Sequence, residues 1–464
     1  MYASCIKKEL LTNILSFRYV LTFVLFVTLT MAATIIRTQI YKKQAKDYNA
    51  AVNERVKIVS EAGADRQMLQ SLGLTVEKRP NPLSIFALGL ENEMSRSFTV
   101  SERQLPVTGL RKLNNASFQY FLQLDMVLII NVVCSLLALL LIYDGVCGER
   151  EQGTLKMMLS GPLPRDVVIV SKLVAGLLTL LVPLAIAWVL SLVYATVVGK
   201  VVFSPDQMGR LMWIVMFSVF YISFVFSVGM AVSCWVQRSA TSLAVCLFCW
   251  IMFVLAIPNF VPMIAKNFAP IPPQSKIALE KRVIKETIET DLVPKWREEL
   301  GATGKYTDPN DLMGELANMQ DEEEFRREAQ IEQFYSSRIR RQLGLNQQIS
   351  RISPSASYIY GSTQLAGTGV QDFLSLLAEV DRFQRSYTEI QDDLTKQQRE
   401  AQSAQQANGA PQQIDPALLP RFEPRVISLA AAMNQCWIDL VLLVGGTVIL
   451  LMVAIIGFVR YDVK

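Results

Sequence analysis

The side chains that could perform chemistry in this sequence are few, and most of them are excluded by their surroundings. No histidine occurs among the 464 residues, so Ser-His-Asp and Cys-His nucleophilic systems, histidine-ligated zinc and histidine proton shuttles are ruled out. The stretch GATGKY at 301–306 has the wrong spacing for a phosphate-binding loop, with Tyr306 where a hydroxyl residue of another kind is required. Cys246 and Cys249 form a CxxC pattern inside an apolar segment, where packing is favoured over redox chemistry. We therefore predict that the chain is not an enzyme and holds no metal or cofactor of its own.

A short charged stretch is the strongest candidate for a functional site. The sequence GEREQGTLK, residues 148–156, interrupts two long apolar runs. On a helix, charges three or four positions apart can pair, but none of the four charges here has an opposite charge at that spacing. We expect a short cytoplasmic helix whose charges are left for solvent or for a partner, with an ordinary solvated loop as the alternative. Gly153 would serve either a close approach between backbones or a frayed helix end.

Six apolar segments are long enough to cross a membrane as helices. The chain is 51% hydrophobic with a positive mean hydropathy, and a helix of ~20 apolar residues spans a hydrocarbon core of ~30 Å. Most of each segment's middle lacks Lys, Asp and Glu, whose burial in lipid costs at least ~2.5 kcal/mol. The predicted fold class is an all-α polytopic membrane protein, with spans at about 14–36, 120–143, 168–198, 210–235, 241–262 and 437–459.

The distribution of Lys and Arg predicts the orientation of these spans. Basic residues gather in the short connections and near both ends of the chain, for example at Lys7, Arg150, Arg238 and Arg460. Under the positive-inside rule this side is cytoplasmic, so both termini are expected in the cytoplasm. The net charge of +4 is otherwise dispersed, without a basic stripe that would bind nucleic acid.

The spans divide the chain into alternating membrane and extracytoplasmic parts. We expect an interfacial helix and the first span, a smaller extracytoplasmic domain, spans 2 to 5, a mostly helical extracytoplasmic stalk domain, and the last span with a cytoplasmic tail. The corresponding ranges are 1–36, 37–119, 120–262, 263–436 and 437–464.

The second outer region should be an antiparallel helical stalk. Prolines from Pro258 and Pro262 onward are expected to end the fifth span. Residues 353–369, which are rich in small residues and glycine, are expected to turn the chain back near the membrane surface. Apolar residues recur at helical spacing over about 275–300, 321–350 and 370–402.

Three further features concern the interior of the molecule. Residues 79–91, RPNPLSIFALGLE, should run extended because of their prolines. Their apolar side chains would form a small core for the first outer domain or, alternatively, a substrate surface. Asp125 and Asp439, near the outer ends of spans 2 and 6, would either line the vestibule of a transport pathway or simply be hydrated. Pro183 is expected to kink the third span and is a candidate hinge.

The residues around the charged stretch resemble the signature of a transporter family. Within the run 135–176 the matching features are Asp144, Gly148-Glu149-Arg150-Glu151, Gly153-Thr154-Leu155, Leu159-Ser160, Pro164-Arg165 and Lys172. This run resembles the type-2 exporter (ABC-2) permeases of ATP-binding cassette transporters. Residues 79–91 and 353–369 are similar to a subgroup with a large extracytoplasmic domain, often described as resembling the multi-copper-enzyme-maturation permease group.

The resemblance implies a membrane subunit that works with a separate ATPase. In such permeases two membrane subunits, either a homodimer or a pair of related paralogues, assemble with two copies of an ATP-binding subunit that carries ATP and Mg. The connection between spans 2 and 3, here 146–159, contains a coupling helix that docks on the ATPase. By carry-over the contacting residues are Glu149, Arg150, Glu151, Gly153 and Thr154, with Leu155 and Met158 at the apolar join.

The leading functional hypothesis is therefore export of an unidentified substrate across the cytoplasmic (inner) membrane of a bacterium. Membrane lipids and an extracytoplasmic protein are further expected partners. One alternative is mechanotransmission, in which strokes of the ATPase move the outer domains and nothing crosses the membrane. Another is a non-transporting membrane scaffold that recruits partners without any ATPase.

Overall fold

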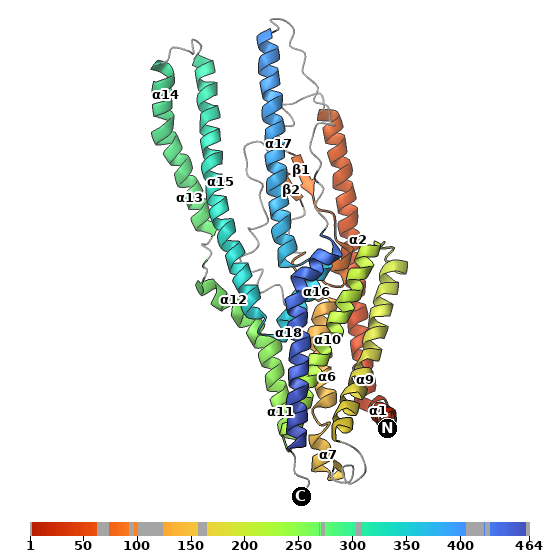
Figure 1. Cartoon of the computed structure of the whole chain (residues 1–464). Coiled ribbons are helices and arrows are strands. Elements are labelled where there is room, and N and C mark those ends of the chain that lie inside the picture. Colours follow the sequence, from red (N-terminus) through yellow and green to blue (C-terminus); the bar gives the residue numbers. More distant parts are fainter. Residues whose placement is uncertain are drawn as a thin grey trace.

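The computed structural model (Figure 1) describes most of the chain, in segments separated by gaps. The described residues are 2–62, 74–91, 97–100, 124–155, 165–268, 270, 274–302, 309–404, 422 and 427–460.

Six helical stretches among the described residues are long and apolar enough to span a membrane, and each overlaps one of the predicted spans. The described residues are nearly all helical. The all-α polytopic membrane fold is therefore confirmed. The six stretches are Tyr19–Glu54, Met126–Glu151, Val167–Val198, Pro205–Trp235, Ser239–Phe268 and Leu429–Val459.

Several of these spans are built from more than one helical segment. A first helix, α1 (Tyr2–Ile14), precedes them and packs against the third span. The first span lies in α2 (Phe17–Ala62), and the second contains α5 (Met126–Ile129), η3 (Ile130–Cys134) and α6 (Ser135–Ile142). The third contains α9 (Arg165–Val193) and η4 (Tyr194–Val198), and the fourth is α10 (Pro205–Trp235). The fifth stretch contains α11 (Ser239–Trp250), η5 (Ile251–Ala256) and α12 (Ile257–Phe268), and the sixth is α18 (Leu429–Val459). The short helix α7 (Cys147–Glu151) follows α6.

The helix starts follow from local sequence. At α10 the hydroxyl of Ser204 accepts from the backbone N–H of Gln207 while the Gln207 side chain accepts from Ser204, and Pro205 occupies the first helical position. At α18 the hydroxyl of Ser428 accepts from the N–H of Ala431. These caps satisfy N–H groups that a helix start leaves without partners.

Long helices also form the end of the molecule away from α7 and from both termini, called the outer end here (Figure 1). Helices α13 (Gln274–Thr287), η6 (Ile288–Leu292), α14 (Val293–Ala302) and α15 (Pro309–Ser350) pack together as an antiparallel unit, called the prong. Helix α17 (Val370–Ala404) also projects outward. The helical patterns expected at 275–300, 321–350 and 370–402 are thus confirmed.

The first outer region contributes a polar extension of α2 and a small antiparallel strand pair. Strand β1 (Leu74–Glu77) pairs with β2 (Ser97–Val100). Between them, Pro82–Ile85 form the single-turn helix η1, capped by Asn81, so the prediction of an extended segment was wrong there. The apolar side chains of this segment are buried, but most of them join the main core of the spans rather than a separate outer core; Phe86 lies 5.6 Å from the ring of Trp188.

Residues 353–369 turn the chain back from α15 to α17 as predicted, but they do so through a buried helix, which the sequence did not indicate. Helix α16 (Pro354–Ala366) packs between α10 and α18, and all residues from 355 to 366 are buried. Small residues permit the close approach, because a Cβ at Gly361 would lie 2.3 Å from the ring of Phe217. Tyr358 stacks on Tyr221 of α10 with ring centroids 4.6 Å apart.

The helical stretch of the fifth span continues beyond the end predicted for it. Pro258 and Pro262 lie inside α12, which continues to Phe268. Proline is tolerated in membrane helices where neighbouring helices satisfy the freed backbone groups. Both prolines are buried, so they belong to a packed helix face instead of ending the helix.

Candidate functional site

The charged stretch begins with α7, which is fixed to the inner end of α10. The hydroxyl of Ser233 accepts from the backbone N–H groups of Val146 and Cys147, at 3.0 and 3.1 Å. Both N–H groups lie at the start of α7, where helices lack internal partners. Leu155, after α7, is only 1% exposed. The base of the stretch is therefore held by side chains from another span.

Glu149 is part of a buried charge cluster with two other helices. Lys172 of α9 donates to Glu149 at 2.6 Å and to Glu9 of α1 at 3.1 Å. The lysine side chain is 6% exposed and the two carboxylates about a fifth exposed. A lysine buried this far requires such partners, because removing its charge from water is costly. The cluster joins α1, α7 and α9.

Arg150 and Glu151 bind the two helix ends that meet beside α7. Arg150 donates to the carbonyl oxygens of Cys234 and Val236, at 3.2 and 3.3 Å, where α10 ends. Glu151 accepts from the backbone N–H of Ser239, at 3.3 Å, and from its hydroxyl, where α11 begins. A helix end leaves carbonyl groups, and a helix start leaves N–H groups, without internal partners. Both charges therefore act as caps.

The prediction that these charges lack partners within the chain was wrong for Glu149, Arg150 and Glu151, and their contact with an ATP-binding subunit stays a prediction. Their partners are not on their own helix, as the spacing indicated, but on α1, α9, α10 and the start of α11. Spacing within one helix cannot reveal partners that the fold brings from far away in the sequence. Lys156 and Met158 lie outside the described residues.

The surface that α7 presents outward is the turn after it. Residues 151–154 are exposed. Gly153 has φ +73°, and no described atom lies within 4 Å of the position where a Cβ would stand, so Gly153 ends the helix in a left-handed conformation. Close approach of a partner backbone to Gly153 stays a prediction. Gln152, which the sequence reasoning did not single out, stands between Glu151 and Gly153 on this surface.

Asp125 and Asp439 are both buried, so the interpretation as simply hydrated carboxylates was wrong. Asp125 accepts from the backbone N–H groups of Leu88 and Leu128, both at 2.7 Å, and caps α5. Asp439 forms a two-bond ion pair with Arg351, at 2.8 and 3.0 Å. A role of either in a transport pathway stays a prediction. Pro183 lies within α9, and its role as a hinge likewise stays a prediction.

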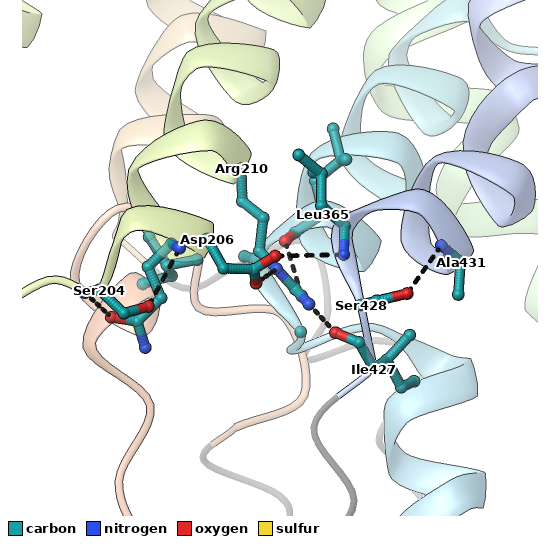
Figure 2. A network of polar contacts seen from close by, with 12 residues as sticks. Ser204, Asp206, Arg210, Leu365, Ile427, Ser428 and Ala431 are labelled. Carbon is teal, nitrogen blue, oxygen red and sulfur yellow. Dashed lines mark hydrogen bonds and ion pairs between the residues drawn. The ribbon is translucent and has the colours of Figure 1, made fainter.

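A second polar network joins the outer ends of three helices, and Figure 2 shows Arg210 of α10 at its centre. Arg210 is 5% exposed. It donates to Asp206 at 2.7 Å, to the carbonyl of Leu365 in α16 at 3.5 Å, and to the carbonyl of Ile427 just before α18. Asp206 also accepts from the N–H of Leu429, at 3.3 Å. One buried cation therefore ties α10, α16 and α18 together.

Comparison with known proteins identifies the family. A family model described as "ABC-2 family transporter protein" matches residues 3–463. No curated protein matches the chain. The match does not separate the subgroup with a large extracytoplasmic domain, so that finer resemblance stays a prediction. Family members are membrane components of transporters that partner, in general, with an ATP-binding subunit. Since the match covers nearly the whole chain and agrees with its membrane-spanning helices, this protein belongs to the ABC-2 family of transporter membrane proteins.

Proposed function

We propose that this chain converts ATP hydrolysis by a separate cassette ATPase into movement of its own spans, and thereby exports or extrudes a substrate. The proposal rests on the exposed turn 151–154. The contacts of Glu149, Arg150 and Glu151 connect α7 to α1, α9, α10 and the start of α11, and we call these contacts the base of the turn. An exposed turn supplies a contact surface, and a rigid base passes on a displacement of that surface.

The contacts of the base determine which helices would move when the ATPase displaces the turn. The cluster of Glu149 with Lys172 and Glu9 leads to α9 and α1. Arg150 binds the end of α10, and Glu151 binds the start of α11. Because side-chain networks of this kind have little freedom to deform, spans 3, 4 and 5 would move with α7.

The assembly that fits this function contains two ATP-binding subunits and a second permease subunit, a copy of this chain or a related paralogue. ATP and Mg²⁺ would be held by the ATPase. The chain is a multi-pass membrane protein, and helix α1 and the last turn of α18 lie at the same end of the molecule as α7 (Figure 1). That arrangement supports a common cytoplasmic side in a bacterial inner membrane.

Arginine substitutions on the exposed turn test the proposal. Gln152→Arg and Thr154→Arg add bulk and charge at exposed positions, where effects on stability are usually within ~0.5 kcal/mol. We expect each to weaken co-purification of the co-expressed cassette ATPase by about tenfold, equal to ~1.4 kcal/mol of binding. Gln371→Arg, at an exposed position of α17, is the matched control and should retain the ATPase.

Retention of the ATPase and of its activity in both arginine variants would mean that the turn is not the docking surface. A chain that retains no ATPase even in its unmodified form would favour the scaffold alternative.

Helix α16 favours a second candidate function, mechanotransmission. On its N-terminal side Arg351 pairs with Asp439 of α18, and on its C-terminal side Arg210 of α10 binds the carbonyl of Leu365. Helices α15 and α17 continue from its two ends (Figure 1). Movement of spans 4 and 6 would therefore reach the outer helices through α16. ATP-driven distance changes between spin labels on α13 and α17, without transport in the same proteoliposomes, would favour this candidate over export.

A further inference from the structure

Helix α12 has an apolar face that no described part of the chain covers. Phe260, Met263, Ile264 and Phe268 are 43–73% exposed. On the opposite side Val261 and the neighbouring small and proline residues are buried, where α12 packs against α15. Burying one large apolar side chain is worth ~1.5–3 kcal/mol, so four of them together require a covering surface.

The length of the fifth span indicates where this face lies. From Ser239 to the end of η5 the chain covers residues 239–256, about 27 Å at ~1.5 Å per residue. A hydrocarbon core is ~30 Å thick. If α11 begins at the inner boundary of the core, α12 therefore begins near the outer boundary. Helix α12 also turns away from the direction of α11 (Figure 1), so it does not continue straight into the water outside.

The residues of α12 fall into three groups around the helix. At 3.6 residues per turn, the buried positions 258, 261, 262 and 265 form one arc, and the exposed apolar positions 260, 263, 264 and 268 form a second. The polar residues Asn259 and Lys266 lie together in a third arc, whereas Asn267, in the last turn, is an exposed polar residue within the apolar arc. A helix with one face toward protein, one apolar face and one polar face fits a boundary between protein, lipid and water.

The apolar face is also continuous with a lipid-facing surface. Phe248, Ile251, Met252 and Leu255 of α11 and η5 are exposed apolar residues within the same membrane-spanning stretch as α12. Lipid acyl chains cover these residues. The next turns of the chain, in α12, would be covered by the same leaflet at the level where acyl chains meet headgroups. Lysine near such a boundary can extend its ammonium toward lipid phosphates.

We propose that α12 is a surface helix of the outer leaflet: its face of Phe260, Met263, Ile264 and Phe268 rests in the lipid interface. Because α12 packs under α15, it supports the base of the prong on the bilayer. The occupant of the face is lipid.

Depth-dependent quenching tests the proposal in the full-length protein. In a cysteine-free background reconstituted into phosphatidylcholine–phosphatidylglycerol nanodiscs, Ile264→Cys carries an environment-sensitive fluorophore. Lipids carry nitroxides either near the headgroup or near the acyl-chain end. We expect the label at 264 to be quenched severalfold more by the shallow nitroxide. Phe248→Cys in α11 is the deep control and should show the reverse preference, and Leu279→Cys, an exposed position of α13, should be quenched by neither.

Three results would overturn the proposal. A label at 264 that behaves like the one at 279 lies in water, and one that behaves like the one at 248 lies in an ordinary transmembrane segment. Energy transfer between labels at 264, without quenching by lipid, would make the face an interface between two copies. If the cysteine-free background does not fold, photo-crosslinking benzoylphenylalanine at Phe268 in the native background decides: a phospholipid adduct supports the proposal, and an adduct to a second copy overturns it.

Discussion

At the scale of single residues, the charges of Glu149, Arg150 and Glu151 bind other parts of the chain. Glu149 and Arg150 point into the molecule and hold α7 against α9 and the end of α10. Gln152 and Thr154 are exposed beside them. Within this stretch the inward residues therefore fix the position of α7, and we propose that the exposed residues form the contact surface for the ATPase.

The charge cluster predicts unequal effects of removing its members. Lys172→Met leaves two partly buried carboxylates facing each other, whereas Glu9→Gln leaves the pair of Lys172 with Glu149 intact. We expect Lys172→Met to lower the free energy of unfolding by ~1–3 kcal/mol and Glu9→Gln by clearly less, measured by thermal unfolding in detergent. Adding Glu149→Gln to Lys172→Met should recover part of the loss. Equal losses for the two single variants would contradict the cluster.

A buried carboxyl at the start of α17 predicts a pH dependence of stability. Burial raises the pKa of Asp372 from 3.8 to about 6, against the opposing effects of the Gly369 N–H and of Arg210. The folded protein then holds a proton that the unfolded chain releases, so stability falls as pH rises from about 4 to about 6. Asp372→Asn removes this loss.

We therefore expect the melting temperature of Asp372→Asn, relative to the unmodified chain, to increase as pH rises from about 4 to about 7. Glu389→Gln, at an exposed position of the same helix, should show a difference that changes little with pH. A difference for Asp372→Asn that stays constant over this range would show that the carboxyl titrates normally.

At the scale of helices, hydropathy predicted the six spans because each is a long apolar segment. It missed α16, which is 13 residues long and rich in Ser, Ala and Tyr, since a helix of that length and composition looks like a loop. Small residues that suggest a turn in water permit close packing between helices. The prolines of α12 were expected to end the helix, but tertiary contacts override their local helix-breaking preference.

The ion pair of Arg351 with Asp439 is expected to anchor the start of α16 to the last span. Arg351→Ala leaves Asp439, whose side chain is 2% exposed, buried without its cation. We expect a loss of ~3–5 kcal/mol in the free energy of unfolding, measured by thermal unfolding. The double variant Arg351→Leu and Asp439→Leu should recover most of it, because well-packed apolar residues can replace a buried pair.

The exposed Arg338 of α15 provides the control for this pair. Its guanidinium lies over the ring of Phe334, 4.6 Å from the centroid, so Arg338→Ala should cost no more than ~1 kcal/mol. A loss for Arg351→Ala as small as that for Arg338→Ala would show that the buried pair does not anchor α16.

At the scale of the whole molecule, two polar clusters lie at opposite ends of the spans. The inner cluster holds α7 and the exposed turn, and the outer network holds α16 between α10 and α18 (Figure 1, Figure 2). The spans connect them as one packed core. Sequence reasoning located the inner site from its charges. The contacts that join the outer network to α16 and α18 connect residues more than 150 positions apart, such as Arg210 and Leu365, which spacing does not reveal.

The most direct test of the central claim is a contact map of the exposed turn. Photo-crosslinking benzoylphenylalanine replaces Gln152, with the same substitution at Gln371 of α17 as the control, in membranes that contain the assembled complex. The account predicts that position 152 forms an adduct with the cassette ATPase and that position 371 does not. An ATPase that co-purifies with the chain while position 152 yields no ATPase adduct would contradict it.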